Sequence, residues 1–457
     1  MPRLDVTNPY SGEVIATLDE VGAEAVDGAV TRARRCLPPP PPAERAAVLE
    51  RAARLVTERA DRLAATICAE AGKPIVQARG EVARCADTLI YSAIEARTLA
   101  GEIVPLEGTS AGVGKLAYTV LEPVGVVGAI SPFNFPLNLV AHKVAPAVAA
   151  GCPVVLKPAE TTPLSAIALA GILHEAGLSE DALQVLVGPG SVVGGALVAH
   201  QDVAMISFTG SSKVGWDIRR DAPRKHVALE LGNSTPVIVA HDADLDAAAA
   251  KIAASGYTHA GQSCISVQRV YVHRSVHAAF LERLVPRVEA LVVGDPADEA
   301  TQVGPVITEA AQERVLEWIG QAVGAGARLV TGGTRDGRLI RPAVLDGITP
   351  AMRVSCEEVF GPVVGVAAYD TDEEAVELAN GSPYGLQAAI FTARVDHAMS
   401  WARRLHFAGV LINETPTFRA DQQPYGGVKD SGNTREGPRY AVRSMTEPKL
   451  VVVALPG

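Results

Sequence analysis

The alternation of apolar and polar positions divides the chain into two kinds of region. Residues 43–106 repeat apolar side chains at helical spacing among Ala, Leu, Glu and Arg, and Gly72-Lys73-Pro74 interrupts that pattern. From Val124 onward, short β-branched runs alternate with helix-like stretches, and the alternation resumes after residue 233. Strand followed by helix, repeated several times, is typical of a parallel sheet covered on both faces. The pattern therefore predicts two α/β units and a mostly helical region before them.

Two segments fit neither α/β unit. Residues 106–123 and 446–456 both have an extended pattern of mixed polar and apolar residues. Outlying strands of this kind commonly pair between subunits, so they suggest an oligomer.

Composition narrows the class of protein. With 457 residues, 48% hydrophobic and 20% charged, the chain is long enough for about three globular units and too apolar to be disordered. The net charge of −10 has the wrong sign for a nucleic-acid partner. We expect no membrane partner, because the start lacks an apolar signal core and prolines break the apolar stretch 124–156. Six cysteines without a CxxC pair favour reduced thiols in the cytoplasm.

Two strand-to-helix junctions could hold the pyrophosphate of a dinucleotide, because a helix N-terminus has unpaired N–H groups and a partial positive charge. The first is the loop 188–194 around Gly190, which lacks the G-x-G-x-x-G spacing and is equally a plain turn. The second runs from Phe208 through Gly210 to Ser211 and Ser212, where helix capping alone would also explain the serines.

Lys157 and Glu160 close a predicted strand in the order Lys-Pro-Ala-Glu. Open α/β sheets hold ligands at the carboxyl ends of their strands, and an ammonium with a carboxylate can grip the two hydroxyls of a ribose. A surface ion pair is the alternative. In the ribose interpretation, Glu160 would repel a 2′-phosphate and favour NAD over NADP.

Three residues are candidates for acyl chemistry. Cys264 lies in a polar stretch between a helix and a strand, but a thiol with a reference pKa of about 8.5 needs local help to act as a nucleophile. Glu230 ends an apolar strand, where its carboxylate could be a general base or could cap the next turn. The amide of Asn134 could donate to an oxyanion or satisfy local backbone.

We predict no metal site. His273 and His277 have helical spacing but no third ligand. Asp242, Asp244 and Asp246 lack the glycine and glutamate of a calcium loop, which favours helix capping instead.

Eight motifs occur in a characteristic order along the chain: NPYSGEVI, SPFNFP, KPAE, FTGS, LELGN, GQSC, EEVFGPV and PYGGVKDSGNTREG. Together they make the chain similar to the aldehyde dehydrogenase superfamily, and especially to its lactaldehyde, phosphonoacetaldehyde and non-phosphorylating glyceraldehyde-3-phosphate dehydrogenases. The resemblance implies NAD(P)-dependent oxidation of an aldehyde to a carboxylic acid by a homodimer or homotetramer. It also implies an α/β fold with two Rossmann-like parallel-sheet domains and a β-strand oligomerisation arm.

On this basis we assign a cofactor-binding domain to residues 1–104 and 124–233 and a catalytic domain to residues 234–430. The oligomerisation arm and C-terminal tail then comprise residues 105–123 and 431–457.

The resemblance also implies roles for individual residues. Cys264 matches the nucleophile, Asn134 the oxyanion donor, Glu230 the general base, and Glu436 a second carboxylate in proton relay. The expected contacts to NAD, or to NADP, follow the same motifs and comprise Pro132, Lys157, Glu160, Gly190, Gly210, Ser211, Glu358 and Phe360.

The chain departs from the family pattern at Asn233, Tyr425 and Thr434. At the position of Tyr425 the family usually has phenylalanine. We expect these three residues at the borders of the site rather than at its reacting atoms, where they would tune the choice of substrate. The subgroups suggest a small oxygenated or anionic aldehyde, although Ser263 stands where several anion-binding members have arginine. Candidate substrate-pocket residues are Asn138, His142, Ser263, Ile265, Thr417, Phe418 and Arg419.

Two alternatives remain open. In the CoA-acylating relatives the thioester passes to CoA, and those enzymes tend to lack a carboxylate at the Glu230 position. An inactive dinucleotide-binding scaffold is the other alternative, against which the presence of Cys264, Glu230 and Asn134 argues.

Overall fold

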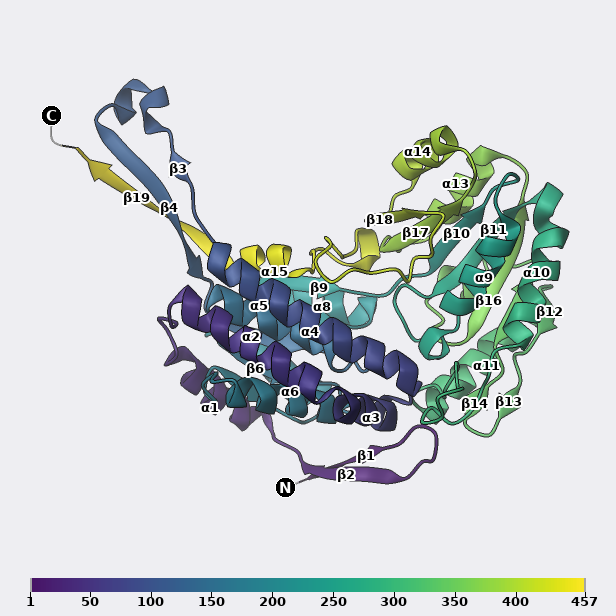
Figure 1. Ribbon diagram of the computed structural model, residues 1–457, viewed down its shortest axis with the longest axis horizontal. Coiled ribbons are helices and arrows are strands. Elements are labelled where there is room, and N and C mark those ends of the chain that lie inside the picture. The colour runs from purple at the N-terminus through teal and green to yellow at the C-terminus, as the bar shows by residue number, and fades with distance from the viewer. Residues whose placement is uncertain (1, 456–457) are drawn as a thin grey trace.

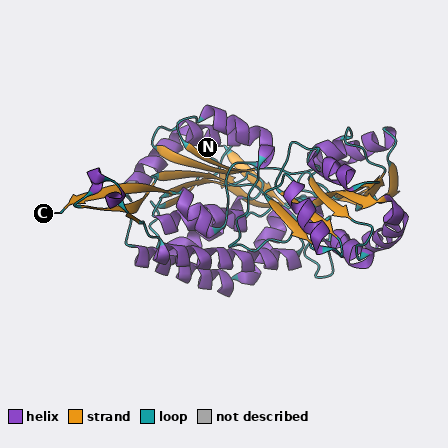
Figure 2. Ribbon diagram, turned by 90° about the horizontal axis from the view of Figure 1, so that it is seen from above, coloured by secondary structure: helices purple, strands orange, loops and turns teal. Residues whose placement is uncertain are grey.

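The computed structural model describes residues 2–455. Two α/β units lie side by side, and a narrow β arm projects from one of them (Figure 1). Seen from above, helices lie on both sides of the strands in each unit (Figure 2). The α/β class and the two predicted units are thus both present.

The first unit contains a five-stranded, entirely parallel sheet in the order β7-β6-β5-β8-β9. Its strands are β5 (Val126–Ile130), β6 (Val154–Lys157), β7 (Leu183–Val185), β8 (Val203–Thr209) and β9 (His226–Glu230). The chain runs from β5 outward to β7 and then returns to place β8 on the other side of β5. This reversal creates a crevice at the carboxyl ends of β5 and β8, where open α/β sheets hold ligands.

Helices cover both faces of this sheet, which explains why strands such as β6 are buried throughout. One face packs against α2 (Pro42–Glu58), α3 (Ala60–Ala71), α4 (Ile75–Thr98), α5 (Asn138–Ala150) and α6 (Pro163–Glu175). The other packs against α1 (Ala23–Arg34), α7 (Gly195–Ala199) and α8 (Ser212–Asp221). Gly72 ends α3 in the left-handed conformation, as its stop signal predicted.

The second unit contains a seven-stranded sheet in the order β12-β15-β16-β11-β10-β17-β18. Its strands are β10 (Thr235–Val239), β11 (Val267–His273), β12 (Arg328–Thr331), β15 (Ala343–Asp346), β16 (Val363–Tyr369), β17 (Gln387–Phe391) and β18 (Gly409–Ile412). All neighbours are parallel except β12 and β15. The predicted α/β fold with two parallel-sheet domains is thus present, and the second sheet is mixed only at its edge, where β12 runs antiparallel to β15.

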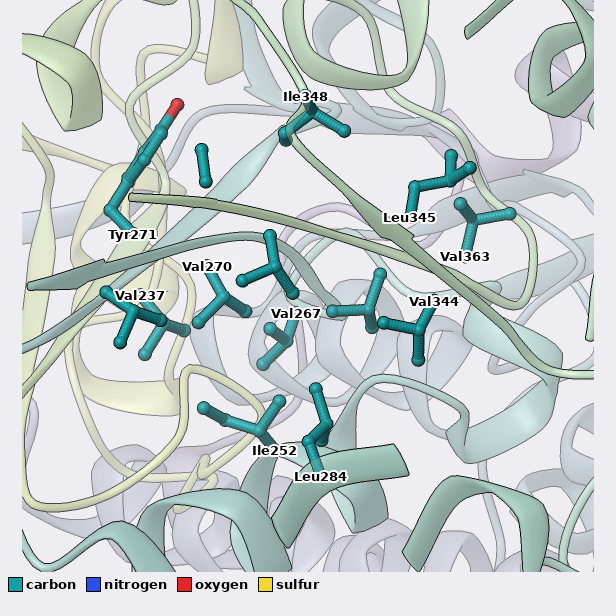
Figure 3. Packing of buried hydrophobic residues seen from close by; sticks show 14 of the residues in the cluster. Val237, Ile252, Val267, Val270, Tyr271, Leu284, Val344, Leu345, Ile348 and Val363 are labelled. Atoms are coloured by element: carbon teal, nitrogen blue, oxygen red, sulfur yellow. The ribbon is translucent and has the colours of Figure 1, made fainter. Parts of the chain in front are cut away.

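The helices of the second unit are α9 (Leu245–Ser255), α10 (His277–Glu289), α11 (Glu309–Gly324), α12 (Arg353–Cys356), α13 (Asp372–Asn380) and α14 (Val395–Arg404). Figure 3 shows β-branched residues of the sheet, such as Val237 and Val270, packed against Ile252 of α9 and Leu284 of α10. These apolar side chains from strands and helices form one continuous core.

The arm is a three-stranded antiparallel sheet of β3 (Ile103–Val104), β4 (Lys115–Pro123) and β19 (Thr446–Ala454). The two outlying segments of the sequence thus pair with each other. Residues 106–112 are not extended as expected, because two short 3-10 turns occupy them.

Smaller elements complete the described chain. Two hairpins consist of β1 (Arg3–Thr7) with β2 (Val14–Asp19), and of β13 (Arg335–Asp336) with β14 (Leu339–Ile340). The last helix, α15 (Pro438–Ser444), contributes Val442 to the helical core of the first unit. Within residues 2–455, no helix has both the length and the apolarity needed to cross a membrane.

Candidate active site

A cleft of about 1030 Å³ lies where the first sheet faces the second unit. The carboxyl ends of the first sheet border it, as do segments that precede the strands of the second sheet. All the predicted site residues except Glu436 line it: Pro132, Asn134, Lys157, Glu160, Gly190, Gly210, Ser211, Glu230, Cys264, Glu358 and Phe360. The sequence motifs therefore converge on one continuous space, although they come from distant parts of the chain.

Cys264 follows a tight turn that enters β11 from its amino end. His259, Ala260 and Gly261 take consecutive positive φ angles of 49°, 54° and 72°. A side chain at Gly261 would overlap the backbone of Gly361, so the turn requires glycine there. Burial raises the pKa of the Cys264 thiol to about 12, so the thiolate needs support from its neighbours.

Tyr425 is one neighbour of the Cys264 sulfur. Its hydroxyl lies 3.0 Å from the Cys264 sulfur, and both side chains pack with Ile265 and Leu386. The expectation that Tyr425 lies at the border of the site is wrong, since its hydroxyl contacts the sulfur directly. The motif around Tyr425 is recognisable in the sequence. The contact of its hydroxyl with Cys264 is not, because the two residues are 161 positions apart in the chain and meet only in the folded protein.

Asn134 lies on the loop between β5 and α5 and is almost fully buried. Its side-chain amide donates to the carbonyl of Gln262 at 3.0 Å. The amide therefore reaches across the cleft to the segment that carries Cys264. One amide hydrogen makes this bond, and a primary amide has a second hydrogen to donate.

Glu230 ends β9 and is 3% exposed. Neither carboxylate oxygen has a hydrogen-bond partner among the described residues, so Glu230 does not cap the following turn. Burial and, next, the charge of Glu436 raise its pKa well above the ordinary value. A buried carboxylate without partners is costly to the fold, which makes Glu230 a candidate for chemistry.

Glu436 lies outside the main cleft, in a small adjoining pocket that it shares with Glu230, His142 and Lys143. It accepts a hydrogen bond from Arg419 at 2.9 Å, and the ammonium of Lys143 lies 3.6 Å away. Burial opposes its ionisation, but Lys143 and Arg419 outweigh burial and lower its pKa. The pKa values of the two carboxylates are thus shifted in opposite directions, because only Glu436 is paired.

The candidate pocket residues Asn138 and His142 belong to a buried hydrogen-bond network. Asp421 accepts hydrogen bonds from both side chains, at 3.2 and 2.9 Å, and forms two bonds with Arg84 of α4. This network ties the loop that carries Arg419 and Tyr425 to the helices of the first unit. Sequence reasoning missed Arg84, Asp421 and Lys143, because nothing in their local motifs indicates a shared cluster.

Lys157 and Glu160 form an ion pair of 3.2 Å within the cleft. Glu160 also accepts a hydrogen bond of 2.7 Å from the amide of Gly190, the first residue of the short helical segment Gly190–Gly194. The pair is therefore part of the cleft wall, with Lys157 buried and Glu160 partly exposed to the cleft.

Ser211 occupies the N-cap position of α8, but its side chain makes no capping hydrogen bond. The hydroxyl of Ser212 donates to the carbonyl of Asp430 instead. The first amides of a helix have no partner within the helix, and here Gly210, Ser211 and Val214 border the cleft. A pyrophosphate fits this helix end, because its oxygens would take the uncapped N–H groups.

Glu358 and Phe360 precede β16 at the opposite side of the cleft. Glu358 accepts a hydrogen bond of 3.0 Å from the amide of Asn233, and burial raises its pKa to about 7. A side chain at Gly232 would overlap the carboxylate of Glu358, so glycine permits this close approach. Arg314 lines the cleft as well and was not predicted, since no motif surrounds it.

No group of His, Cys, Asp and Glu suited to a metal ion occurs in residues 2–455. Asp244 caps α9 by accepting from the amide of Ala247, which confirms its interpretation as a cap. His277 pairs with Asp346 at 2.9 Å.

Comparison with known proteins agrees with this geometry. Residues 2–451 match the model of the aldehyde dehydrogenase family. The chain belongs to the aldehyde dehydrogenase family. It is 46% identical to 3-sulfolactaldehyde dehydrogenase from Priestia megaterium, over 99% of this chain and 95% of that protein.

Two solved structures are similar to the whole chain. One is glyceraldehyde-3-phosphate dehydrogenase from Methanocaldococcus jannaschii in complex with NADP, with 39% identity, a TM-score of 0.95 and 99% of each chain covered. The other is an aldehyde dehydrogenase from Physcomitrella patens in complex with the reaction product succinate, with 40% identity, a TM-score of 0.96 and 99% and 95% coverage. The suggested family is confirmed, the relatives named for lactaldehyde and glyceraldehyde 3-phosphate fit two of the suggested subgroups, and the chain is an NAD(P)-dependent aldehyde dehydrogenase.

Proposed function

We propose that this aldehyde dehydrogenase oxidises a small oxygenated or anionic aldehyde to its acid, with NAD as the preferred cofactor and water as the acyl acceptor. The observation that carries this proposal is that one cleft joins Cys264 and Glu230 to the uncapped N-terminus of α8. The domain boundaries given by the sequence belong to the same proposal.

The residues of the cleft fit a dinucleotide. Amides at the start of α8 would bind the pyrophosphate, Lys157 and Glu160 the adenosine ribose, and Glu358 with Phe360 the nicotinamide ribose. The bound nicotinamide would supply a hydride acceptor. Because the Glu160 carboxylate would repel the 2′-phosphate of NADP, we propose NAD as the preferred cofactor.

Cys264 is the proposed nucleophile. Its thiolate attacks the aldehyde carbon and forms a thiohemiacetal whose oxygen carries the negative charge. The backbone N–H of Cys264 and the amide of Asn134 are the proposed donors to that oxygen, a pair worth several kcal/mol in a site that excludes water. Loss of the aldehyde hydrogen as hydride leaves a thioester on the sulfur.

Glu230 is the proposed base for the second half of the reaction. Its unpartnered oxygens are free to take a proton from water, and a raised pKa makes the carboxylate a stronger base once it is ionised. Glu436, paired with Arg419 and Lys143, is the proposed second carboxylate of the relay. The presence of Glu230 also supports water over CoA as the acyl acceptor.

The substrate class rests on the relatives and on a second cavity. The three relatives described above are named for sulfolactaldehyde and glyceraldehyde 3-phosphate or contain succinate, and all three compounds are small oxygenated anions. A cavity of about 520 Å³, bordered by Tyr425, Phe418 and Gln423, is the proposed substrate side. Because Glu436 neutralises Arg419, we propose recognition by hydrogen bonds as much as by charge.

We further propose a homodimer or homotetramer. Strand β19 exposes Leu450, Val452 and Val453, at 54%, 47% and 42%, and apolar side chains so exposed on a projecting edge favour burial against another subunit. The cytoplasm remains the proposed location, and all six cysteines are unpaired in the structure.

A panel of aldehydes tests the function. Lactaldehyde, 3-sulfolactaldehyde, glyceraldehyde 3-phosphate, succinate semialdehyde and neutral aliphatic aldehydes of matched length are assayed with NAD and with NADP, each with and without CoA. We expect free acid as the product, higher kcat/KM for the oxygenated anions, and NAD preferred. Acyl-CoA in place of acid would establish the CoA-acylating alternative, and no reduced cofactor with any aldehyde would favour an inactive scaffold.

A further inference from the structure

The Tyr425 hydroxyl is the side-chain hydrogen-bond partner of the Cys264 sulfur, at a distance of 3.0 Å. The two side chains share an apolar cluster with Ile265 and Leu386, and Tyr425 is only 3% exposed. In such surroundings a hydrogen bond is stronger than it is in water, because solvent competes less for both groups. The contact is therefore a major influence on whether the sulfur is a thiol or a thiolate.

The position of the Tyr425 ring is closely fixed. The backbone of Tyr425 forms an antiparallel bridge with Glu436. The guanidinium of Arg419 lies over the ring, 3.7 Å from its centroid, and donates to the carboxylate of Glu436. Glu436 thus holds both the backbone of Tyr425 and the cation on the face of its ring.

Chemistry favours the phenol as the donor of this bond. A phenol O–H is a stronger donor than a thiol S–H, which is weak. A cation over the ring further favours loss or sharing of the phenol proton, since it attracts electron density from the ring. Burial raises the pKa of Tyr425 well above its ordinary value, and Arg419 acts in the opposite direction.

The charged groups that face Cys264 are Arg419, Glu230 and Glu358. Burial is the largest influence and raises the pKa of the thiol, and the two carboxylates act in the same direction. The hydrogen bond from Tyr425 is the largest opposing influence, followed by the charge of Arg419. Support for a thiolate thus comes mainly from the Tyr425 side of the sulfur.

We propose that Tyr425 is a catalytic residue of this chain, whose hydroxyl donates to the Cys264 thiolate and makes that thiolate available in a buried site. The proposal rests on the role of Cys264 given under the proposed function. It goes beyond the family pattern, because a phenylalanine at this position has no hydroxyl.

The pH dependence of Cys264 alkylation tests the proposal without any aldehyde. Full-length wild type and Tyr425→Phe are treated with iodoacetamide across a pH series, and the modified Cys264 peptide is quantified by mass spectrometry. We expect the apparent pKa of alkylation to rise by about one unit in the variant, which corresponds to about tenfold slower alkylation at neutral pH.

A matched control and a second variant complete the experiment. Tyr369→Phe removes another buried hydroxyl, which donates to the carbonyl of Val239 at 3.3 Å and lies outside the cleft; it should leave the alkylation profile unchanged. Incorporation of 3-fluorotyrosine at position 425 keeps the packing and makes the phenol a stronger donor. That substitution should lower the apparent pKa, and it keeps the test decisive even where Tyr425→Phe does not fold.

Superimposable profiles for the wild type and the folded Tyr425→Phe variant would overturn the proposal. Faster alkylation of that variant would overturn it too, because it would mean that the thiol donates to the phenol and is held protonated. An unchanged or raised apparent pKa of Cys264 alkylation with 3-fluorotyrosine at position 425 would likewise overturn the proposal. Failure of the proposed function is distinguishable, since substantial turnover by Cys264→Ala would refute the nucleophile but leave the alkylation result intact.

Discussion

The two sheets face the cleft with opposite ends. The five-stranded sheet presents the carboxyl ends of its strands, where Lys157, Thr209 and Glu230 lie. The seven-stranded sheet presents amino ends, since Cys264 precedes β11 and Glu358 precedes β16. Only the first arrangement follows the rule that open α/β sheets bind ligands at their carboxyl edge.

This difference separates two ways of building a site. At the first sheet, backbone amides and a helix end are the proposed binding groups, and the sequence context of the strands indicates them. At the second sheet, a strained turn brings Cys264 into the cleft, and neighbouring side chains set its electrostatics. Substitutions at the two edges should therefore affect binding and chemistry separately.

The largest effect is expected for Cys264→Ala. Loss of the proposed nucleophile should reduce turnover by about a thousandfold or more, while the affinity for NAD, measured by fluorescence titration, changes little. Cys152→Ala, at a buried cysteine outside the cleft, serves as the control. Substantial oxidation by Cys264→Ala would show that another group attacks the aldehyde.

Glu230→Gln is expected to separate the two half-reactions. Acylation of Cys264 can still proceed, whereas hydrolysis lacks its base, so rapid-mixing absorbance should record a burst of reduced cofactor followed by a rate about a hundredfold lower. Mass spectrometry should detect the acyl group on the Cys264 peptide. Uniform slowing without a burst would contradict the role assigned to Glu230.

Glu436→Gln should shift the pH dependence of deacylation. Burial and the charge of Glu436 raise the pKa of Glu230, and hydrolysis needs the ionised form, so the rate rises as pH increases through that pKa. Removing the Glu436 charge lowers the pKa of Glu230, and the acid limb of the profile should move to lower pH by about one unit. Glu436→Asp keeps the charge and should move it less. A shift to higher pH would be incompatible with this coupling.

Glu160→Gln should have the smallest effect and should concern the cofactor alone. The substitution keeps an acceptor for the amide of Gly190 but removes the charge opposed to a 2′-phosphate. The ratio of kcat/KM for NADP to that for NAD should rise by about tenfold. An unaltered ratio would mean that another residue selects the cofactor.

Much of the molecule could be predicted from the sequence. Periodicity indicated both α/β units and the helix stop at Gly72, because these depend on local patterns. Of the site residues that the ordered motifs indicated, all except Glu436 line the cleft. The misplacement of Tyr425 and the unpredicted Arg84, Asp421 and Lys143 have a common cause, since their roles arise from contacts between segments 161 to 337 positions apart. The antiparallel β12 likewise depends on packing at the sheet edge.

The hydrogen bond from Asn134 to the carbonyl of Gln262 joins the two halves of the molecule beside the sulfur. Such a bond weakens steeply with small changes in length and angle. A rotation of one half against the other would therefore displace the amide from the neighbourhood of the reacting carbon before the halves had visibly separated. With the role proposed for Asn134, the oxyanion pocket would be complete only while this bond holds, so an opening between the halves would also interrupt the chemistry.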